Sequence, residues 1–174
     1  PVDAAFDDPI KPIGPFFDEK IAKERVLKFG WSVKEGPGKR WRRVVASPRP
    51  MEIVELEQIL DLIDREHTVI ACGGGGIPVS RSKNGKLNGI EAVIDKDLTS
   101  SLLASDLKAD VLLLVTGVPK VAINFGSNEQ RWLDSLSLRE AEKFQSELQF
   151  DAGSMGPKVD AILKFLSGFF PKKI

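Results

Sequence analysis

Residues 69–79 read Val-Ile-Ala-Cys-Gly-Gly-Gly-Gly-Ile-Pro-Val, a short apolar run that stops at four consecutive glycines and then resumes. An apolar run bounded in this way is typical of a buried strand. Four glycines suit a place where the backbone needs unusual dihedral angles or where a ligand comes close to it. In an α/β protein that place is the carboxyl edge of the sheet. A flexible turn between strands fits the same residues, whereas a Walker phosphate loop does not, because no Gly-Lys-Ser/Thr follows.

Composition limits the class of protein. The 174 residues fit one domain or one domain with a small appendage, and 25 basic side chains balance 25 acidic ones, which gives no case for a nucleic-acid or membrane partner. Cys72 is the single cysteine, which excludes an internal disulfide and favours a reducing cytoplasm. No apolar run approaches the roughly 18 residues of a membrane span. Because the chain opens on Pro1, we expect a piece of a longer protein.

A change of pattern near residue 49 predicts two parts, a small subdomain over 1–49 and a larger body over 50–174. In the first part, the prolines predict an irregular extended segment over 1–17, followed by a helix over 18–29 and a hairpin over 31–45. Three arginines of this hairpin are interpreted as a solvated face or a phosphate-facing patch: Arg40, Arg42 and Arg43.

In the body, helical periodicity begins at Met51, and an Asn84-Gly85 turn predicts a hairpin excursion over 77–93. Further helices are predicted over 95–107, 137–148 and 157–166. Strands are predicted over 67–72, 110–115 and 121–125. The alternation of strand and helix predicts an α/β fold with a mainly parallel sheet. His67 has no partners arranged for a triad or a metal site, so we assign it a structural role.

Two predicted helix starts depart from the helix-dipole rule. Asp95 is a good N-cap and Asp97 suits a first turn, but Lys96 places a cation there. Lys158 does the same beside Pro157. A lysine beside free backbone N–H groups makes an anion site, so two such starts together with the glycine run favour a polyanionic ligand, most simply nucleotide phosphates.

Five motifs, in order, resemble those of the carbamate kinases in the amino acid kinase family. They are Lys11-Pro12-Ile13-Gly14-Pro15-Phe16, Arg43-Val44-Val45-Ala46-Ser47-Pro48, Gly73-Gly74-Gly75-Gly76-Ile77-Pro78-Val79, Val93-Ile94-Asp95-Lys96-Asp97-Leu98 and Ala152-Gly153-Ser154-Met155-Gly156-Pro157-Lys158-Val159. The resemblance covers most of this chain. It implies a three-layer α/β/α sandwich with a protruding lid, here residues 1–49, and a cytoplasmic homodimer. It also implies reversible phosphoryl transfer between ATP and carbamate, giving ADP and carbamoyl phosphate, with Mg²⁺ held mainly by the nucleotide phosphates.

The resemblance also implies roles for individual residues. Lys96 and Lys158 would bind phosphate, Asp97 would orient them, and Lys11 would cover the transferring group. The acceptor and phosphoryl side would be Gly73, Gly74, Gly75 and Gly76. The nucleotide edge would comprise Thr116, Gly117, Val118, Lys120, Met155, Gly156 and Pro157.

This sequence also departs from the family pattern. The family's amino-terminal half, with its Gly-Gly-Asn phosphate loop, and most of its last strand have no counterpart in these residues. Gly117 replaces an aspartate, and Ala122 replaces a common tyrosine, both on the nucleotide side. Two alternatives therefore remain open: a catalytically silent fragment or paralogue that serves as a binding or assembly module, and a sister kinase that acts on another acyl acceptor.

Overall fold

The computed structural model describes residues 3–151 and 154–168. By the density of contacts along the chain, it divides into two compact units. The first consists of Pro1–Arg49 with Ile77–Ile94, and the second of Pro50–Gly76 with Asp95–Ile174. Each unit is described by itself. Among the described residues, no helix is both long and apolar enough to cross a membrane.

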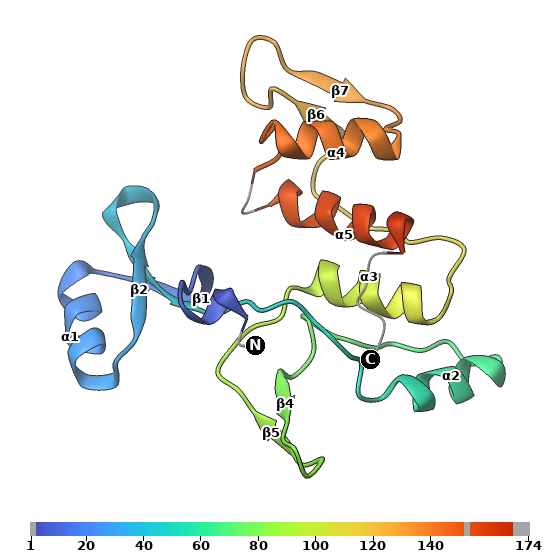
Figure 1. Cartoon of the computed structure of the whole chain (residues 1–174). Helices are drawn as coiled ribbons and strands as arrows, with labels where there is room; N and C mark the ends of the chain where they lie inside the picture. Colours follow the sequence, from blue (N-terminus) through green and yellow to red (C-terminus); the bar gives the residue numbers. More distant parts are fainter. Residues whose placement is uncertain (1–2, 152–153, 169–174) are drawn as a thin grey trace. The chain divides into compact units, whose positions relative to one another are not determined.

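The first unit is built on a three-stranded antiparallel sheet in the order β1–β3–β2 (Figure 1). Strand β3 (Trp41–Val45) lies between β1 (Lys11–Phe17) and β2 (Ser32–Glu35). The expectation of an irregular segment over 1–17 is therefore wrong for residues 11–17. The prolines are tolerated because β1 is an edge strand, where a missing N–H costs little. The register of β1 shifts between Ile13 and Phe17, where Gly14 has φ of +67°.

Short elements complete this unit. Helix α1 (Glu19–Phe29) confirms the predicted helix and ends at Gly30 in the left-handed conformation. Asp18 precedes it but makes no side-chain cap. The predicted hairpin at Asn84-Gly85 is confirmed as β4 (Val79–Arg81) and β5 (Leu87–Gly89). Two single-turn 3₁₀ helices, η1 and η2, span Ala4–Phe6 and Pro37–Lys39.

The second unit is mainly helical. Helix α3 (Lys96–Asp106) lies beside α5 (Met155–Ser167), and α4 (Leu138–Ser146) packs on the other side of α5 (Figure 1). A hairpin of β6 (Val121–Ile123) and β7 (Arg131–Leu133) completes this region; β7 had no sequence prediction. The core between α4 and α5 contains Ala141, Phe150 and Val159, with Met155 and Leu163 packed against it.

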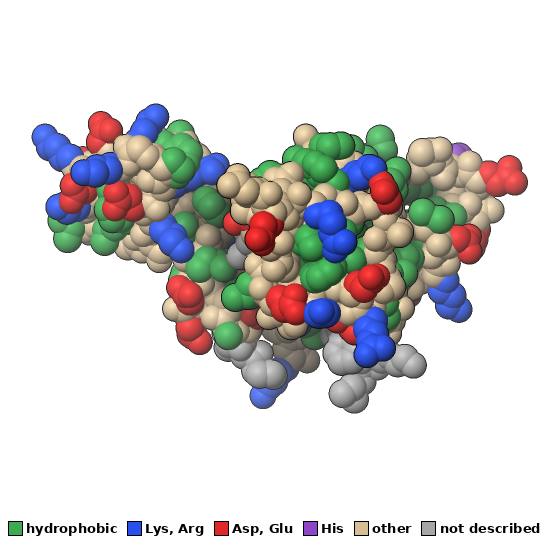
Figure 2. Space-filling view, turned by 90° about the horizontal axis from the view of Figure 1, so that it is seen from above, with side chains coloured by type: hydrophobic (Ala, Val, Ile, Leu, Met, Phe, Trp, Pro, Cys, Tyr) green, Lys and Arg blue, Asp and Glu red, His purple; other side chains and the backbone are tan. Residues whose placement is uncertain are grey.

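Helix α2 (Leu56–Asp64) confirms the predicted helical periodicity. Ile59 is the one buried residue of this helix, while Leu60, Leu62 and Ile63 are exposed. An apolar stripe was therefore read correctly from the sequence, and most of it lies open to solvent. Figure 2 shows other hydrophobic side chains that reach the surface between charged ones.

The segments predicted as parallel strands over 67–72 and 110–115 are not strands within the described residues. All pairings between the labelled strands are antiparallel, and the parallel pairing among the described residues is the isolated bridge of Ala46 with Ala92. Ile70, Leu113 and Val115 are 98%, 81% and 82% exposed. A strand needs backbone hydrogen-bond partners in a neighbouring strand. Residues 67–72 and 110–115 have no such partner strand among the described residues, so these apolar segments do not form part of a sheet.

Candidate functional site

The amino end of α3 presents an acidic cap and a lysine. Asp95 has extended backbone angles and its carboxylate accepts the N–H of Asp97 at 2.9 Å, so the predicted N-cap is confirmed. Lys96 is the first helical residue, and its side chain is 58% exposed. Asp97 faces inward and is buried. The helix start therefore places a carboxylate inside the protein and a cation at its surface.

Lys158 approaches this carboxylate from the first turn of α5. Its ammonium lies 3.1 Å from both carboxylate oxygens of Asp97, and the two side chains are 18% and 8% exposed. The ammonium of Lys96 lies 3.9 Å from the same carboxylate. The structure thus brings together all three residues that the sequence predicted as a phosphate-binding set.

The electrostatics of this set suit an anion. One carboxylate between two ammonium groups leaves one positive charge in excess, close to the positive ends of two helix dipoles. The carboxylate also limits the repulsion between the two lysines, which fixes their positions before a ligand arrives. Such a group can bind phosphate oxygens and stabilise charge that develops on them.

Helices α3 and α5 are also joined by a hydroxyl. Ser101 is fully buried, and its Oγ donates to the Ala161 carbonyl oxygen at 2.6 Å. Asp97, Thr99 and Ser101 are the buried polar residues of α3. Sequence reasoning missed Thr99 and Ser101.

The start of α5 requires glycine. The N–H of Gly156 donates to the Asp151 carbonyl oxygen at 2.8 Å, and a Cβ at this position would lie 2.9 Å from the same oxygen. The helix begins at Met155, so Pro157 is its third residue and not its first as predicted. Met155, Gly156 and Pro157 therefore form the turn that carries Lys158.

The glycine run adopts a backbone that other residues rarely adopt. Gly73, Gly75 and Gly76 have φ of +44°, +139° and +87°. The carbonyl oxygen of Gly75 accepts from Thr99 Oγ1 at 2.9 Å, which attaches the run to α3. Cys72 precedes it, and burial together with the nearby Glu55 carboxylate raises the pKa of its thiol.

Residues 116–120 lie before β6, as the sequence order requires. Thr116 Oγ1 donates to the Val118 carbonyl oxygen at 2.7 Å, which folds the segment around Gly117. Lys120 forms an ion pair with Asp134, directly after β7, and so closes the base of the β6–β7 hairpin. Lys120 is therefore engaged within this hairpin, whereas Lys158 pairs with Asp97.

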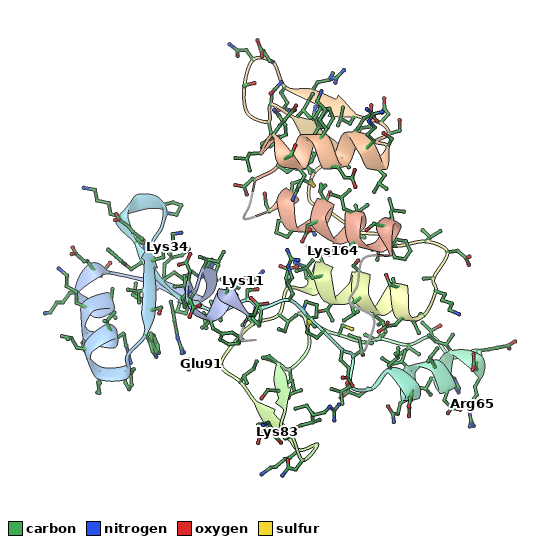
Figure 3. All side chains as sticks on the ribbon, in the orientation of Figure 1. Lys11, Lys34, Arg65, Lys83, Glu91 and Lys164 are labelled. Atoms are coloured by element: carbon green, nitrogen blue, oxygen red, sulfur yellow. The ribbon has the colours of Figure 1, made fainter. Side chains whose placement is uncertain are left out.

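Lys11 belongs to the first unit, on β1 opposite Val45 (Figure 3). Beside it, the predicted solvated arginines have internal partners. Arg42 Nε donates to the Gly14 carbonyl oxygen at 2.7 Å, and Arg40 donates to that of Phe16 at 3.0 Å. These two arginines therefore hold β1 at the point where its register shifts.

The third arginine of this hairpin, Arg43, stacks on Trp31 at 4.4 Å and forms an ion pair with Glu91 (Figure 3). One terminal nitrogen of its guanidinium is therefore paired within the first unit, while its buried Nε has no hydrogen-bond partner among the described residues.

A metal site made by the protein alone is not evident. The described residues contain no group of three or more His, Cys, Asp or Glu side chains that could hold an ion. The carboxylate of Asp97 is already occupied by Lys158. The residues present would therefore fit a metal ion that is held chiefly by phosphate oxygens and water.

Comparison with known proteins is decisive for the family. A sequence profile of the amino acid kinase family matches residues 15–169. The chain belongs to the amino acid kinase family. This membership confirms the predicted resemblance and the predicted fold class, in which helices and strands are mixed.

Relatives within the amino acid kinase family carry the name carbamate kinase. The carbamate kinase of Pyrococcus horikoshii is 48% identical over 164 residues, which are 94% of this chain and 52% of that protein. The carbamate kinase-like protein YqeA of Escherichia coli is 52% identical over 163 residues, again 94% of this chain and 52% of the relative. The chain therefore spans about half the length of the curated relatives it matches.

A solved structure agrees. Carbamate kinase from Giardia lamblia bound to AMP-PNP superposes with a TM-score of 0.84 at 44% identity, over 96% of this chain and 53% of that one. This agreement at substantial identity supports the arrangement described here for each unit.

Proposed function

We propose that the protein to which this chain belongs is a carbamate kinase, which interconverts ATP and carbamate with ADP and carbamoyl phosphate. In the forward direction a carboxylate oxygen of carbamate attacks the γ-phosphorus of ATP, and the bond from that phosphorus to the β–γ bridging oxygen breaks. The observation that carries the proposal is the cluster of Lys158, Asp97 and Lys96, in which two ammonium groups lie within 3.9 Å of one buried carboxylate.

The chemistry explains why this set matters. Phosphoryl transfer spreads negative charge over the oxygens of the transferred group, so catalysis depends on positioning and on fixed positive charge. Lys158 supplies that charge from α5 and Lys96 supplies it from α3. Asp97 holds the ammonium of Lys158 at 3.1 Å before substrate binds. Mg²⁺, held chiefly by nucleotide phosphates and water, would add further positive charge.

The remaining assignments belong to this proposal. Residues 1–49 form the lid, and Lys11 covers the transferring group. The glycine run, Gly73 to Gly76, forms the acceptor wall. The nucleotide edge consists of residues 116–120 and Met155 to Pro157. The enzyme works as a homodimer in the cytoplasm, on small-molecule substrates.

The test is a coupled assay that reports ATP formed from ADP and carbamoyl phosphate. Lys158→Ala is expected to lower kcat by roughly 100- to 1,000-fold, since it removes one preorganised donor to the transferring group. Lys164→Ala is the matched control. Lys164 also lies on α5, but it pairs with Asp160 of its own helix, so its loss leaves turnover unchanged (Figure 3). Full activity in Lys158→Ala would refute the assignment.

A silent binding or assembly module is the second candidate, and one observation favours it. The apolar segments 67–72 and 110–115 are unpaired in the described residues, as in a chain that joins another polypeptide. Titration with Mg-ATP separates the two candidates: a kinase shows a ligand-dependent rise in melting temperature, and a silent module shows none. A sister kinase for another acyl acceptor would bind ATP but turn over no carbamoyl phosphate.

A further inference from the structure

Thr99 lies where the glycine run meets helix α3. It is 3% exposed, and its hydroxyl lies 2.9 Å from the Gly75 carbonyl oxygen. The same hydroxyl lies 3.1 Å from the Asp95 carbonyl oxygen, the usual contact of a helical threonine one turn back. A hydroxyl has one proton, so the two carbonyls compete for it, and the contact with Gly75 is the shorter of the two.

The glycine run depends on such a contact. Its internal backbone hydrogen bonds are short-range, from Gly73 N–H to the Ala71 carbonyl oxygen and from Gly75 N–H to that of Cys72. Glycine gains no packing from a side chain and has wide conformational freedom, so its conformation must be set by neighbours. Adding a Cβ at Gly73, Gly74 or Gly76 would meet no atom within 4 Å, so packing does not confine these three residues.

We propose that Thr99 is a positioning residue that holds the glycine run against the helix carrying Lys96 and Asp97. In the proposed kinase the glycine run forms the acceptor wall, so the effect of this positioning on substrate binding rests on the proposed function. Thr99 then fixes the distance between the wall and the phosphate-binding set. In this proposal Thr99 does not contact the nucleotide or the acceptor, and it acts through the backbone of Gly75.

Removing the Thr99 hydroxyl should affect the contact of α3 with the glycine run but not its contact with α5. Thr99 is two residues beyond Asp97 on α3, and the glycine run reaches the same helix through this contact. The pair of Lys158 with Asp97 and the link of Ser101 to Ala161 do not involve Thr99. Loss of the hydroxyl therefore releases the glycine run and leaves the contact between α3 and α5 intact.

Backbone amide exchange tests the positioning directly on the 174-residue chain. Thr99→Val keeps the shape of the side chain and removes the proton donor, and Thr99→Ser restores the donor. We expect exchange at Gly73 and Gly75 to become at least about tenfold faster in Thr99→Val and to return towards the wild-type rate in Thr99→Ser. Ser101→Ala removes another buried hydroxyl of α3 and is expected to leave these two amides unchanged. Equal exchange in wild type and Thr99→Val would overturn the proposal.

Steady-state kinetics test what the positioning serves. Thr99→Val is expected to raise KM for carbamoyl phosphate by about tenfold while KM for ADP stays within about twofold, and Thr99→Ser is expected to reverse the change. Equal changes in both KM values would overturn the acceptor-side role. An inactive wild-type protein would refute the proposed function and with it the acceptor role, whereas the exchange rates would still decide whether Thr99 positions the run.

Discussion

Helices α3 and α5 contrast with the segments 67–72 and 110–115, although both belong to the second unit. The helices bury Leu102, Val159 and Ala161, and Ser101 and Lys158 link them across their interface. The extended segments are at least as apolar, yet Leu113 and Val115 are more than four-fifths exposed. Apolar sequence alone therefore does not produce a core.

The difference follows from where each element finds its hydrogen bonds. A helix pairs its own N–H and C=O groups within one segment, so it forms before it packs. A central parallel strand takes every pair from neighbouring strands that lie elsewhere in the sequence. In this chain the helices form from their own residues, whereas the two apolar segments have no partner strand among the described residues.

Truncating one leucine in each region gives the sharpest test of this contrast. Leu102→Ala should lower the free energy of unfolding by about 3 kcal/mol, because Leu102 is only 2% exposed and its truncation leaves a cavity. Leu113→Ala should change it by less than about 0.5 kcal/mol, because Leu113 is already 81% exposed. Urea unfolding of the 174-residue chain measures both. Similar losses for the two variants would mean that residues 110–115 are packed in solution.

Removing the carboxylate between the helices should have the next largest effect. Asp97→Ala leaves the ammonium of Lys158 without its partner inside the protein, at a cost of about 2 kcal/mol. This value lies below that of a fully buried pair because Lys158 keeps some contact with water. Adding Lys158→Met should recover more than half of the loss, since the unpaired charge then disappears. Failure of this rescue would show that Asp97 stabilises α3 in another way.

The buried hydroxyl bridge offers a smaller and more specific test. Ser101→Ala should cost about 1 kcal/mol, the usual net value of one buried hydrogen bond. Ser105 is the matched control on the same helix, because its buried hydroxyl has no hydrogen-bond partner among the described residues. Ser105→Ala should be neutral or slightly stabilising, as judged by thermal unfolding. A larger loss for Ser105→Ala would contradict the assigned packing of α3.

The same contrast decides what the sequence could predict. Every predicted helix exists, and Lys96, Asp97 and Lys158 meet as expected, because caps, periodicity and charge at a helix start are local signals. The strands over 67–72 and 110–115 were wrong, because an apolar run does not reveal whether partner strands are present. Strand β1 was missed because its prolines conceal an edge strand braced by Arg42. Thr99 was missed because its partner, Gly75, lies 24 residues away.

A substitution in the amino-terminal cap of helix α4 should have the smallest effect on stability, because this cap is formed by neighbours in sequence. Ser137 and Glu140 form a capping box, in which Ser137 Oγ accepts from the N–H of Glu140 and the Glu140 carboxylate accepts from the N–H of Ser137. The side-chain hydrogen bond from Ser137, followed by the backbone one, lowers the pKa of Glu140 below its ordinary value of 4.5.

A lowered pKa in the folded state means that this contribution to stability is complete above about pH 4.5. It decreases as the pH falls from there through the lower folded-state value, because the unfolded chain then binds the proton first. Glu140→Gln should therefore reduce the slope of melting temperature against pH below about pH 4.5, and change that slope little at pH 7. Glu142→Gln, two residues further along α4 and also exposed, is the control for a simple change of net charge. Equal slopes in the two variants would show that the capping box does not form in solution, and that α4 depends on its packing against α5 as the strands depend on their partners.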